Sequence, residues 1–278
     1  MAVISLTSAQ LAFGHVALLD HADFSLEAGE RVGLIGRNGT GKSSLLKIIS
    51  GRSKLEDGLL VMQQGLKIAY VEQEPVFDPE STVFDAVAAG MGEQQAMLAE
   101  YEALTGQFGQ GNDEALMERM HVLQGKLDAT DGWNLANKVD TTLDRLGLAR
   151  EAKMGTLSGG MQKRVGLARA FATEAPILLM DEPFGALDEI VRDRLNEQLR
   201  DLWARTGKTI AFVTHSIPEA VYLSTRIVVM SPRPGRVTDV IESPLPPERP
   251  LHIRESPEFL EIAARVRDGL RAGMGAEV

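Results

Sequence analysis

The sequence predicts an α/β protein built on a mostly parallel β-sheet that is interrupted by a helical insertion. From residue 177 onwards, short apolar runs typical of buried strands alternate with helical patterns, which indicates a parallel sheet. Near the start, a glycine-rich stretch lies between an apolar strand and a helix. Between these two parts, residues 83–148 are helical and charged.

The expected elements follow in order along the chain. The first part predicts strands at Val3–Leu6 and Arg31–Ile35, a turn at residues 26–30 between them, and two short strands within residues 59–73. The later part predicts strand Ile177–Met180, helix Glu189–Arg205, strand Thr209–Thr214, and strands Arg226–Ser231 and Arg236–Ile241 joined by the turn Pro232–Gly235. Four prolines between residues 244 and 250 then mark a linker to a final amphipathic helix, roughly Pro257–Arg271.

Composition excludes several function classes. The net charge is −10 and there is no dense basic patch, so we expect no DNA partner. Cysteine is absent from the sequence, which excludes disulfides, thiolate metal sites and cysteine nucleophiles. No apolar run approaches the roughly 20 residues that a membrane span needs, and the first residues lack a signal-peptide pattern. We therefore expect a cytoplasmic protein.

A phosphate-binding loop is the strongest motif. The residues Gly36-Arg37-Asn38-Gly39-Thr40-Gly41-Lys42-Ser43 match the pattern G-x-x-x-x-G-K-[ST], and they lie between a strand and a helix as that pattern requires. Glycines let the backbone wrap around phosphate oxygens, and the following helix adds its positive end. Lys42 is expected to reach the β- and γ-phosphates and Ser43 to hold magnesium. The alternative, a glycine-rich turn with an incidental lysine, is disfavoured by the strand-to-helix setting.

Two adjacent carboxylates end the apolar strand at 177–180. Neighbouring strand residues point in opposite directions, so Asp181 and Glu182 can serve different purposes. We expect Asp181 to help hold magnesium and Glu182 to act as general base toward an attacking water. On its own this pair could be a charged turn after a strand; beside a phosphate loop, it indicates nucleotide hydrolysis.

A second anion-binding helix start identifies the family. Leu157-Ser158-Gly159-Gly160-Met161-Gln162 precedes a helix, so its serine hydroxyl and amide hydrogens can bind an anion. With the phosphate loop and the acid pair, the sequence resembles the nucleotide-binding domain of ABC ATPases over nearly its whole length. The resemblance implies a P-loop NTPase fold with a RecA-like core, a flanking antiparallel β subdomain and an inserted helical subdomain. It also implies a homodimer in which the LSGG signature of one subunit closes over the ATP held by the other.

The resemblance implies functions for further motifs. Gln73 resembles the Q-loop glutamine, which contacts magnesium and the attacking water, and His215 resembles the switch histidine, which contacts the γ-phosphate. Asp188 lies in a segment resembling the D-loop, which crosses the dimer interface. Phe13 lies where the family usually has an aromatic ring that stacks on adenine, with a plain core phenylalanine as the alternative.

The expected site residues fall into three groups. Those expected in catalysis are Lys42, Gln73, Glu182 and His215. Those expected to bind ATP are Phe13, Gly36, Asn38, Gly39, Gly41, Lys42, Ser43, Ser44, Ser158, Gly159, Gly160 and Asp188. Those expected to hold Mg²⁺ are Ser43, Gln73 and Asp181.

Two branches of the family are represented in the one sequence. From the LSGG signature through DEPFGALD to SPRPGRV, the chain resembles the ATP-binding subunits of nitrate, sulfonate and taurine importers. The acidic helical stretch before it resembles the first domain of ABC-F proteins, which act on ribosomes. Residues 93–154 carry 11 acidic and 6 basic residues, a poor charge for lying against ribosomal RNA. The importer interpretation is therefore favoured, with an ABC-F-like ATPase and a nucleotide-binding module without turnover as alternatives.

The importer interpretation implies an organisation and partners. We expect a nucleotide-binding domain at residues 1–243 with a helical insertion at about 76–165, followed by a proline-rich linker and helix at 244–278. The expected partners are a second copy of the chain, a membrane permease subunit and a solute-binding protein, with a ribosome as the less favoured partner. Such a subunit would be cytoplasmic and peripheral on the inner face of the cell membrane.

Overall fold

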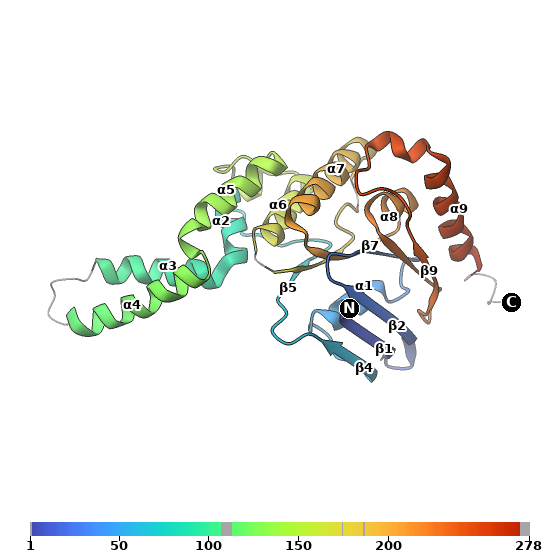
Figure 1. Cartoon of the computed structure of the whole chain (residues 1–278), viewed down its shortest axis with the longest axis horizontal. Helices are drawn as coiled ribbons and strands as arrows, with labels where there is room; N and C mark the ends of the chain where they lie inside the picture. Colours follow the sequence, from blue (N-terminus) through green and yellow to red (C-terminus); the bar gives the residue numbers. More distant parts are fainter. Residues whose placement is uncertain (1, 107–112, 174, 186, 273–278) are drawn as a thin grey trace. The chain divides into compact units, whose positions relative to one another are not determined.

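A computed structural model describes residues 2–106, 113–173, 175–185 and 187–272 of the chain, and the side chains of Phe13 and of residues 113–115 lie outside this description (Figure 1). The chain forms two compact units, which we call the sheet unit and the helical unit. The sheet unit comprises Met1–Glu74 and Glu174–Val278, and the helical unit comprises Pro75–Thr173. None of the helices in the described ranges combines the length and apolarity needed to cross a membrane.

A six-stranded sheet forms the centre of the sheet unit. Its strand order is β5-β6-β7-β3-β8-β9, parallel throughout except for the antiparallel pair β8-β9. The strands are β3 (Arg31–Ile35), β5 (Ile68–Val71), β6 (Ile177–Asp181), β7 (Thr209–Thr214), β8 (Arg226–Met230) and β9 (Val237–Glu242). Every residue of β3, β6 and β7 is buried, as expected for strands of a parallel sheet covered on both faces.

A three-stranded antiparallel sheet flanks this core. It has the order β2-β1-β4, formed by β1 (Ala2–Phe13), β2 (Val16–Glu27) and β4 (Asp57–Met62). The register between β1 and β2 shifts at several points, and Ser8 and His21 adopt positive φ angles of 49° and 48°. These irregularities break the alternation of apolar and polar residues, which explains why the sequence pattern predicts much shorter strands here.

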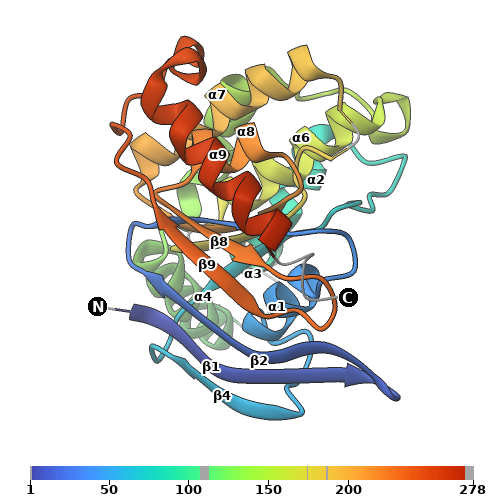
Figure 2. The same cartoon turned by 90° about the vertical axis from the view of Figure 1, so that its right-hand side faces the viewer.

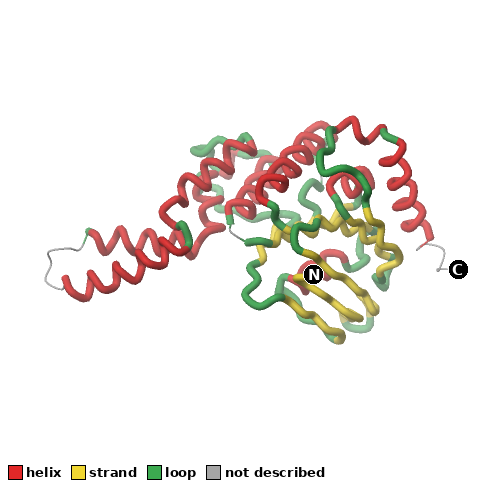
Figure 3. Tube along the Cα trace, in the orientation of Figure 1, coloured by secondary structure: helices red, strands yellow, loops and turns green. Residues whose placement is uncertain are grey.

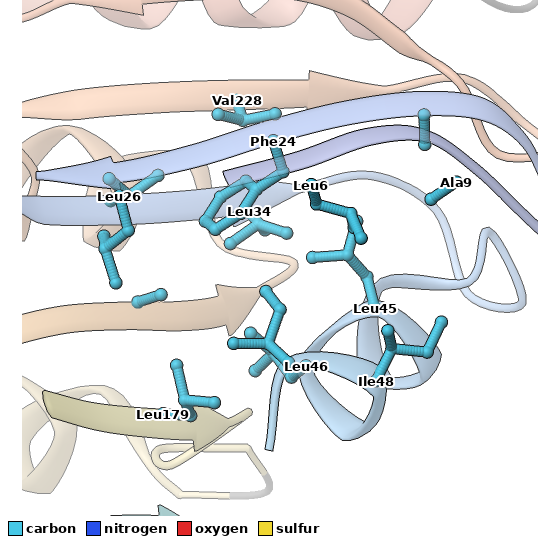
Figure 4. Close-up of a cluster of buried hydrophobic side chains, with 14 of the residues drawn as sticks. Leu6, Ala9, Phe24, Leu26, Leu34, Leu45, Leu46, Ile48, Leu179 and Val228 are labelled. Carbon is cyan, nitrogen blue, oxygen red and sulfur yellow. The ribbon is translucent and has the colours of Figure 1, made fainter. Parts of the chain in front are cut away.

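The helices of the sheet unit bury their apolar faces on these sheets. They are α1 (Lys42–Ile49), α7 (Glu189–Thr206), α8 (Ile217–Leu223), η4 (Leu251–Glu255) and α9 (Pro257–Ala272). Figure 4 shows side chains from α1, both sheets and the strand before the acid pair meeting in one apolar cluster. Leu45 and Leu46 of α1 are fully buried there, which contributes about 1.5–3 kcal/mol for each side chain. The phosphate loop is therefore followed by a firmly anchored helix.

The proline-rich segment after β9 packs against α8. Arg249 is 1% exposed, and its guanidinium donates to the carbonyl oxygens of Val221, Tyr222 and Ser224 at 2.7–3.1 Å. These carbonyls lie at the end of α8, so the arginine supplies hydrogen-bond donors that the helix itself cannot. Figure 2 shows α9, which follows this segment, lying across β8 and β9.

The helical unit contains α2 (Val83–Ala88), η1 (Ala89–Met91), α3 (Gly92–Thr105), α4 (Asp113–Ala129), η2 (Gly132–Asn134), α5 (Leu135–Leu146), η3 (Met154–Thr156) and α6 (Gly159–Ala172) (Figure 3). α2, α5 and α6 pack on one another. α3 and α4 pair, with Arg119 Nε donating to Glu100 Oε1 at 2.7 Å, and the Tyr101 ring of α3 meets the Trp133 ring of η2 edge to face. The expected turn at residues 109–112 lies outside the described residues.

Candidate functional site

The site is assembled at the carboxyl edge of the parallel sheet. Val71 pairs with Met180, Asp181 with Val213, and Ile35 with Thr214, so four neighbouring strands end at almost the same level. Each is followed at once by polar residues, and ligands bind at this edge of open α/β sheets. The residues that follow β5, β6, β7 and β3 are Gln73, Glu182, His215 and the loop 36–41.

The loop between β3 and α1 has the conformation of an anion cradle. Gly41 has a φ of +85°, and a side chain there would place its Cβ 2.7 Å from Leu19 Cδ2. Only glycine fits this backbone without strain. The loop is further held by the turn after β8: a Cβ on Gly235 would lie 1.9 Å from the Thr40 carbonyl oxygen, and Arg233 Nε donates to the Gly39 carbonyl at 3.2 Å.

Lys42 lies folded against the loop that precedes it. Its Nζ donates to the carbonyl oxygens of Gly36 at 2.9 Å and Arg37 at 2.7 Å, and the side chain is 4% exposed. Burial lowers the pKa of Lys42, while the carboxylates of Glu182 and Asp181 act in the opposite direction. An ammonium group with these two anions nearby can form charge-assisted bonds to phosphate oxygens.

Ser43 and Asp181 come together at the foot of the loop. Ser43 Oγ donates to Asp181 Oδ1 at 2.8 Å, and Tyr70 Oη donates to Asp181 Oδ2 at 3.3 Å. Burial and the Asp181 charge raise the pKa of Tyr70, so its hydroxyl stays a donor. A hydroxyl and a carboxylate are hard oxygen ligands of the kind that Mg²⁺ takes when substrate phosphates complete its shell. This donor set fits Mg²⁺. The described residues contain no group of three or more His, Cys, Asp or Glu side chains that could hold a metal ion.

Glu182 lies close to two other residues at the sheet edge, Gln73 and His215. Its Oε2 lies 3.5 Å from Gln73 Nε2 and 3.4 Å from His215 Nδ1. Its φ of 46° is in the left-handed region, and its amide donates to the Val213 carbonyl at 3.1 Å. Such a backbone is strained for a glutamate and is held by its surroundings. Glu182 contacts Gln73 and His215 whereas Asp181 contacts Ser43 and Tyr70, so the two acids can act separately.

A cavity of about 350 Å³ brings many predicted residues together. It is lined by Leu18, Asn38, Gly39, Thr40, Gly41, Lys42, Ser43, Ser44, Gln73 and Glu182. Backbone amides of a helix start, one ammonium and three hydroxyl side chains line it. This is the chemistry that binds a chain of phosphates.

Four predicted ATP contacts lie away from this cavity, and a fifth, Gly36, belongs to the loop but does not line the cavity. Asp188 is exposed and accepts a hydrogen bond from Val191 N at 2.9 Å, so it caps α7. Ser158 caps α6 in the helical unit by accepting from Met161 N at 3.4 Å, with Gly159 and Gly160 forming the first residues of that helix. These four residues are not part of the cavity. The remaining prediction, the side chain of Phe13, falls outside the described part of the chain.

The structure adds residues that sequence reasoning missed. Leu18 and Thr40 line the cavity, and Tyr70 donates to Asp181. Glu219 on α8 is 4% exposed, and burial raises its pKa to about 7, with a hydrogen bond from Thr214 opposing that shift. Thr40 could have been found, because it lies inside the loop motif; Tyr70 and Glu219 carry no local signal that separates them from ordinary strand and helix residues.

Comparisons with known proteins agree with this geometry. A family model described as ABC transporter matches residues 19–185. The chain is 37% identical over 82% of its length to the ATP-binding protein Uup of Haemophilus influenzae, and spans 35% of the length of that relative. It is 34% identical over 91% of its length to the aliphatic sulfonates import ATP-binding protein SsuB of Bacillus cereus, covering 88% of it.

Among solved structures, the dimeric bacterial ABC transporter cassette MJ0796 has a TM-score of 0.62 and 25% identity, with 86% of this chain and 98% of that chain covered. The predicted P-loop NTPase fold is confirmed, and so is the resemblance to both Uup-type and importer-type proteins. With a family model matching more than half of its residues and a relative matching over 91% of its length, the chain belongs to the ABC transporter family.

Proposed function

We propose that the protein hydrolyses ATP in the cavity at the sheet edge and uses that hydrolysis to drive import of a small anion. The observation that carries the hydrolysis is the position of Glu182, a carboxylate lining the cavity with Gln73 and His215 within 3.5 Å. A general base must lie within hydrogen-bond reach of the water it activates. Because Glu182 lines the cavity, its carboxylate can reach a water bound there beside the phosphates.

The polar groups of the site then have distinct functions in the reaction. The amides of residues 36–44 and the Lys42 ammonium bind the β- and γ-phosphates and offset their charge. Gln73 and His215 hold the water against Glu182, and Glu182 accepts its proton. Ser43 and Asp181 would hold Mg²⁺, with Gln73 nearby, and a bound Mg²⁺ would offset the negative charge of the phosphates.

A homodimer completes the site in this proposal. Ser158 caps α6, and Gly159 and Gly160 form its first turn, where backbone amides have no partner within the helix. None of these three residues lines the cavity of the sheet unit. The solved cassette MJ0796 is dimeric. We therefore propose that this helix start and Asp188 from one subunit cover the ATP held by the other.

Activity measured against protein concentration tests the dimer. A site shared by two subunits gives a specific activity that rises with concentration at the low end and then levels off. A specific activity independent of concentration down to the nanomolar range, combined with a monomeric mass in the presence of ATP, would contradict the shared site.

The importer assignment is supported by the extent of the match. The similarity to SsuB runs over 91% of this chain and 88% of that importer subunit, whereas the chain spans 35% of Uup. We propose a cytoplasmic, membrane-peripheral subunit docked on a permease that works with a solute-binding protein, and a sulfonate, nitrate or taurine as the transported anion. Co-purification of the tagged chain with a polytopic membrane protein in mild detergent is the expected result; recovery without any membrane protein would count against it.

A ribosome-associated ATPase is the second candidate, because the 37% identity to Uup is the higher of the two matches. The paired helices α3 and α4 would then be the contacting arm. This candidate predicts that the Glu182→Gln variant pellets with ribosomes when ATP is present and is released by salt. Absence from the pellet at low salt would remove it.

A further inference from the structure

A second cavity lies beside the phosphate loop, and the proposed reaction assigns no part to its arginines. Its volume is about 680 Å³, and it is formed by the loop, the turn after β8 and the C-terminal part of α9. Figure 2 shows how α9 crosses β8 and β9 to reach this side of the sheet unit. The polar side chains that give this basic pocket its character are Arg37, Arg233, Arg267, Arg271 and His215.

The charge of the basic pocket is not neutralised by its own lining. None of the described residues that line it is acidic, although the chain as a whole has a net charge of −10. The side chains of Arg37 and Arg267 form no hydrogen bond or ion pair with any described residue, although the Arg37 carbonyl accepts from Lys42. Arg271 has one acidic neighbour, Asp268 at 3.9 Å, and Arg233 uses its Nε on the Gly39 carbonyl. Four guanidinium groups around one cavity repel one another unless an anion lies between them.

The donor geometry restricts the class of anion. Guanidinium groups donate in pairs to planar or tetrahedral oxyanions such as carboxylates, sulfates and phosphates. Pro232 and Leu270 add apolar surface to the same cavity. The lining therefore suits an oxyanion headgroup that carries a small apolar substituent, as well as the bare ion.

We propose that the basic pocket binds a small tetrahedral oxyanion of the sulfate, sulfonate or phosphate class, at a site separate from the triphosphate site. Two residues link the sites. Asn38 lines both cavities, and His215 lines the basic pocket while its Nδ1 lies 3.4 Å from Glu182 Oε2. An anion bound here offsets positive charge beside the phosphate loop and draws His215 away from Glu182, so it inhibits hydrolysis. This inhibitory part rests on the proposed ATPase function; the binding part does not.

Direct binding is measured first, without nucleotide. The full chain is titrated calorimetrically with sulfate, inorganic phosphate and ethanesulfonate, with chloride holding the ionic strength constant. We expect saturable binding that the double variant Arg267→Gln/Arg271→Gln weakens by about tenfold or more, since two charge-assisted contacts are lost. The matched control is Arg265→Gln on the same helix, because Arg265 pairs with Asp239 at 3.1 Å and does not line the basic pocket. It should bind within twofold of wild type, about the error of the assay.

The Lys42→Ala variant separates the two anion sites. Binding that survives in Lys42→Ala and is lost in the double variant supports the proposal. Binding lost in Lys42→Ala and kept in the double variant would place the anion in the phosphate loop and overturn it, as would saturable binding of none of the three anions. Tighter binding of ethanesulfonate than of sulfate identifies an organic sulfonate or phosphate ester as the natural ligand, and equal binding identifies the bare ion.

The ATPase assay then tests the link between the sites. At a saturating concentration of the preferred anion, the KM for ATP should rise about threefold and kcat should fall in wild type and in Arg265→Gln, and both should stay unchanged in the double variant. If the protein hydrolyses no ATP under any condition, the proposed function fails while the calorimetric result stands. If hydrolysis is normal and anions leave it unchanged in wild type, the inhibitory link is wrong.

Discussion

Replacing Glu182 by glutamine isolates the loss of the general base. The amide has the size of the carboxylate, and its contacts at 3.5 Å to Gln73 and 3.4 Å to His215 can be kept with one oxygen facing them. The backbone φ of 46° is as costly for glutamine as for glutamate, so strain does not change. What is lost is the ability to accept a proton, worth about 10²–10⁴ in kcat, or about 3–5 kcal/mol of barrier.

Steady-state ATPase kinetics and ATP binding are measured together on this variant. We expect kcat to fall by about 10²-fold or more, while ATP affinity stays within about threefold or tightens, and the ATP-bound dimer accumulates. The control, Glu258→Gln, removes an exposed charge at the start of α9 and should leave kcat unchanged. Residual kcat above a tenth of wild type, or wild-type protein that already traps ATP as the variant does, would refute the assignment of Glu182.

Three further predictions follow from contacts of the sheet unit. Gly235→Ala places a Cβ 1.9 Å from the Thr40 carbonyl oxygen and should lower the free energy of unfolding by about 1–3 kcal/mol in urea titrations; an unchanged midpoint would show that the turn can move aside. Ser43→Ala removes a hydroxyl that donates to Asp181 at 2.8 Å and should raise the Mg²⁺ concentration for half-maximal ATPase activity at least about tenfold, whereas Ser43→Thr keeps the hydroxyl and should stay near wild type. Burial raises the pKa of Glu219 from 4.5 to about 7, so the folded chain keeps a proton that the unfolded chain releases, and this stabilisation is lost as pH rises through that range. Relative to Glu219→Gln, wild type should therefore lose unfolding free energy between about pH 4.5 and pH 7; parallel pH profiles would contradict the assigned burial.

Local patterns were enough to predict the central part of the fold. The strands at 177–180 and 209–214 and the helix at 189–205 agree with the structure to within one residue, because fully apolar strands and a capped helix leave strong local signals. The antiparallel sheet was underpredicted, since the bulges at Ser8 and His21 disrupt the alternation on which strand prediction depends. The predicted domain limits at residues 243 and 244 stay a prediction.

Part of the candidate site could be predicted from local sequence, and part depends on how the strands pair. The phosphate loop and acid pair are contiguous in sequence, so their chemistry could be inferred from residue types alone. The approach of Gln73 and His215 to Glu182 depends on the register of three parallel strands, which no local pattern contains. Arg249 illustrates the same limit: a proline-rich segment predicts a linker, yet its arginine is buried against carbonyls more than twenty residues earlier in the chain.

The contact between Gly235 and Thr40 has a consequence for the order of events in nucleotide binding. Gly235 N also donates to the Leu18 carbonyl at 2.8 Å, and Arg233 of the same turn donates to the Gly39 carbonyl at 3.2 Å, so the turn after β8 holds the phosphate loop next to β2. A loop held this way loses its conformational entropy when the chain folds and not when a triphosphate arrives. Nucleotide would then enter a ready-made cradle, and its binding energy would remain available for drawing two cassettes together.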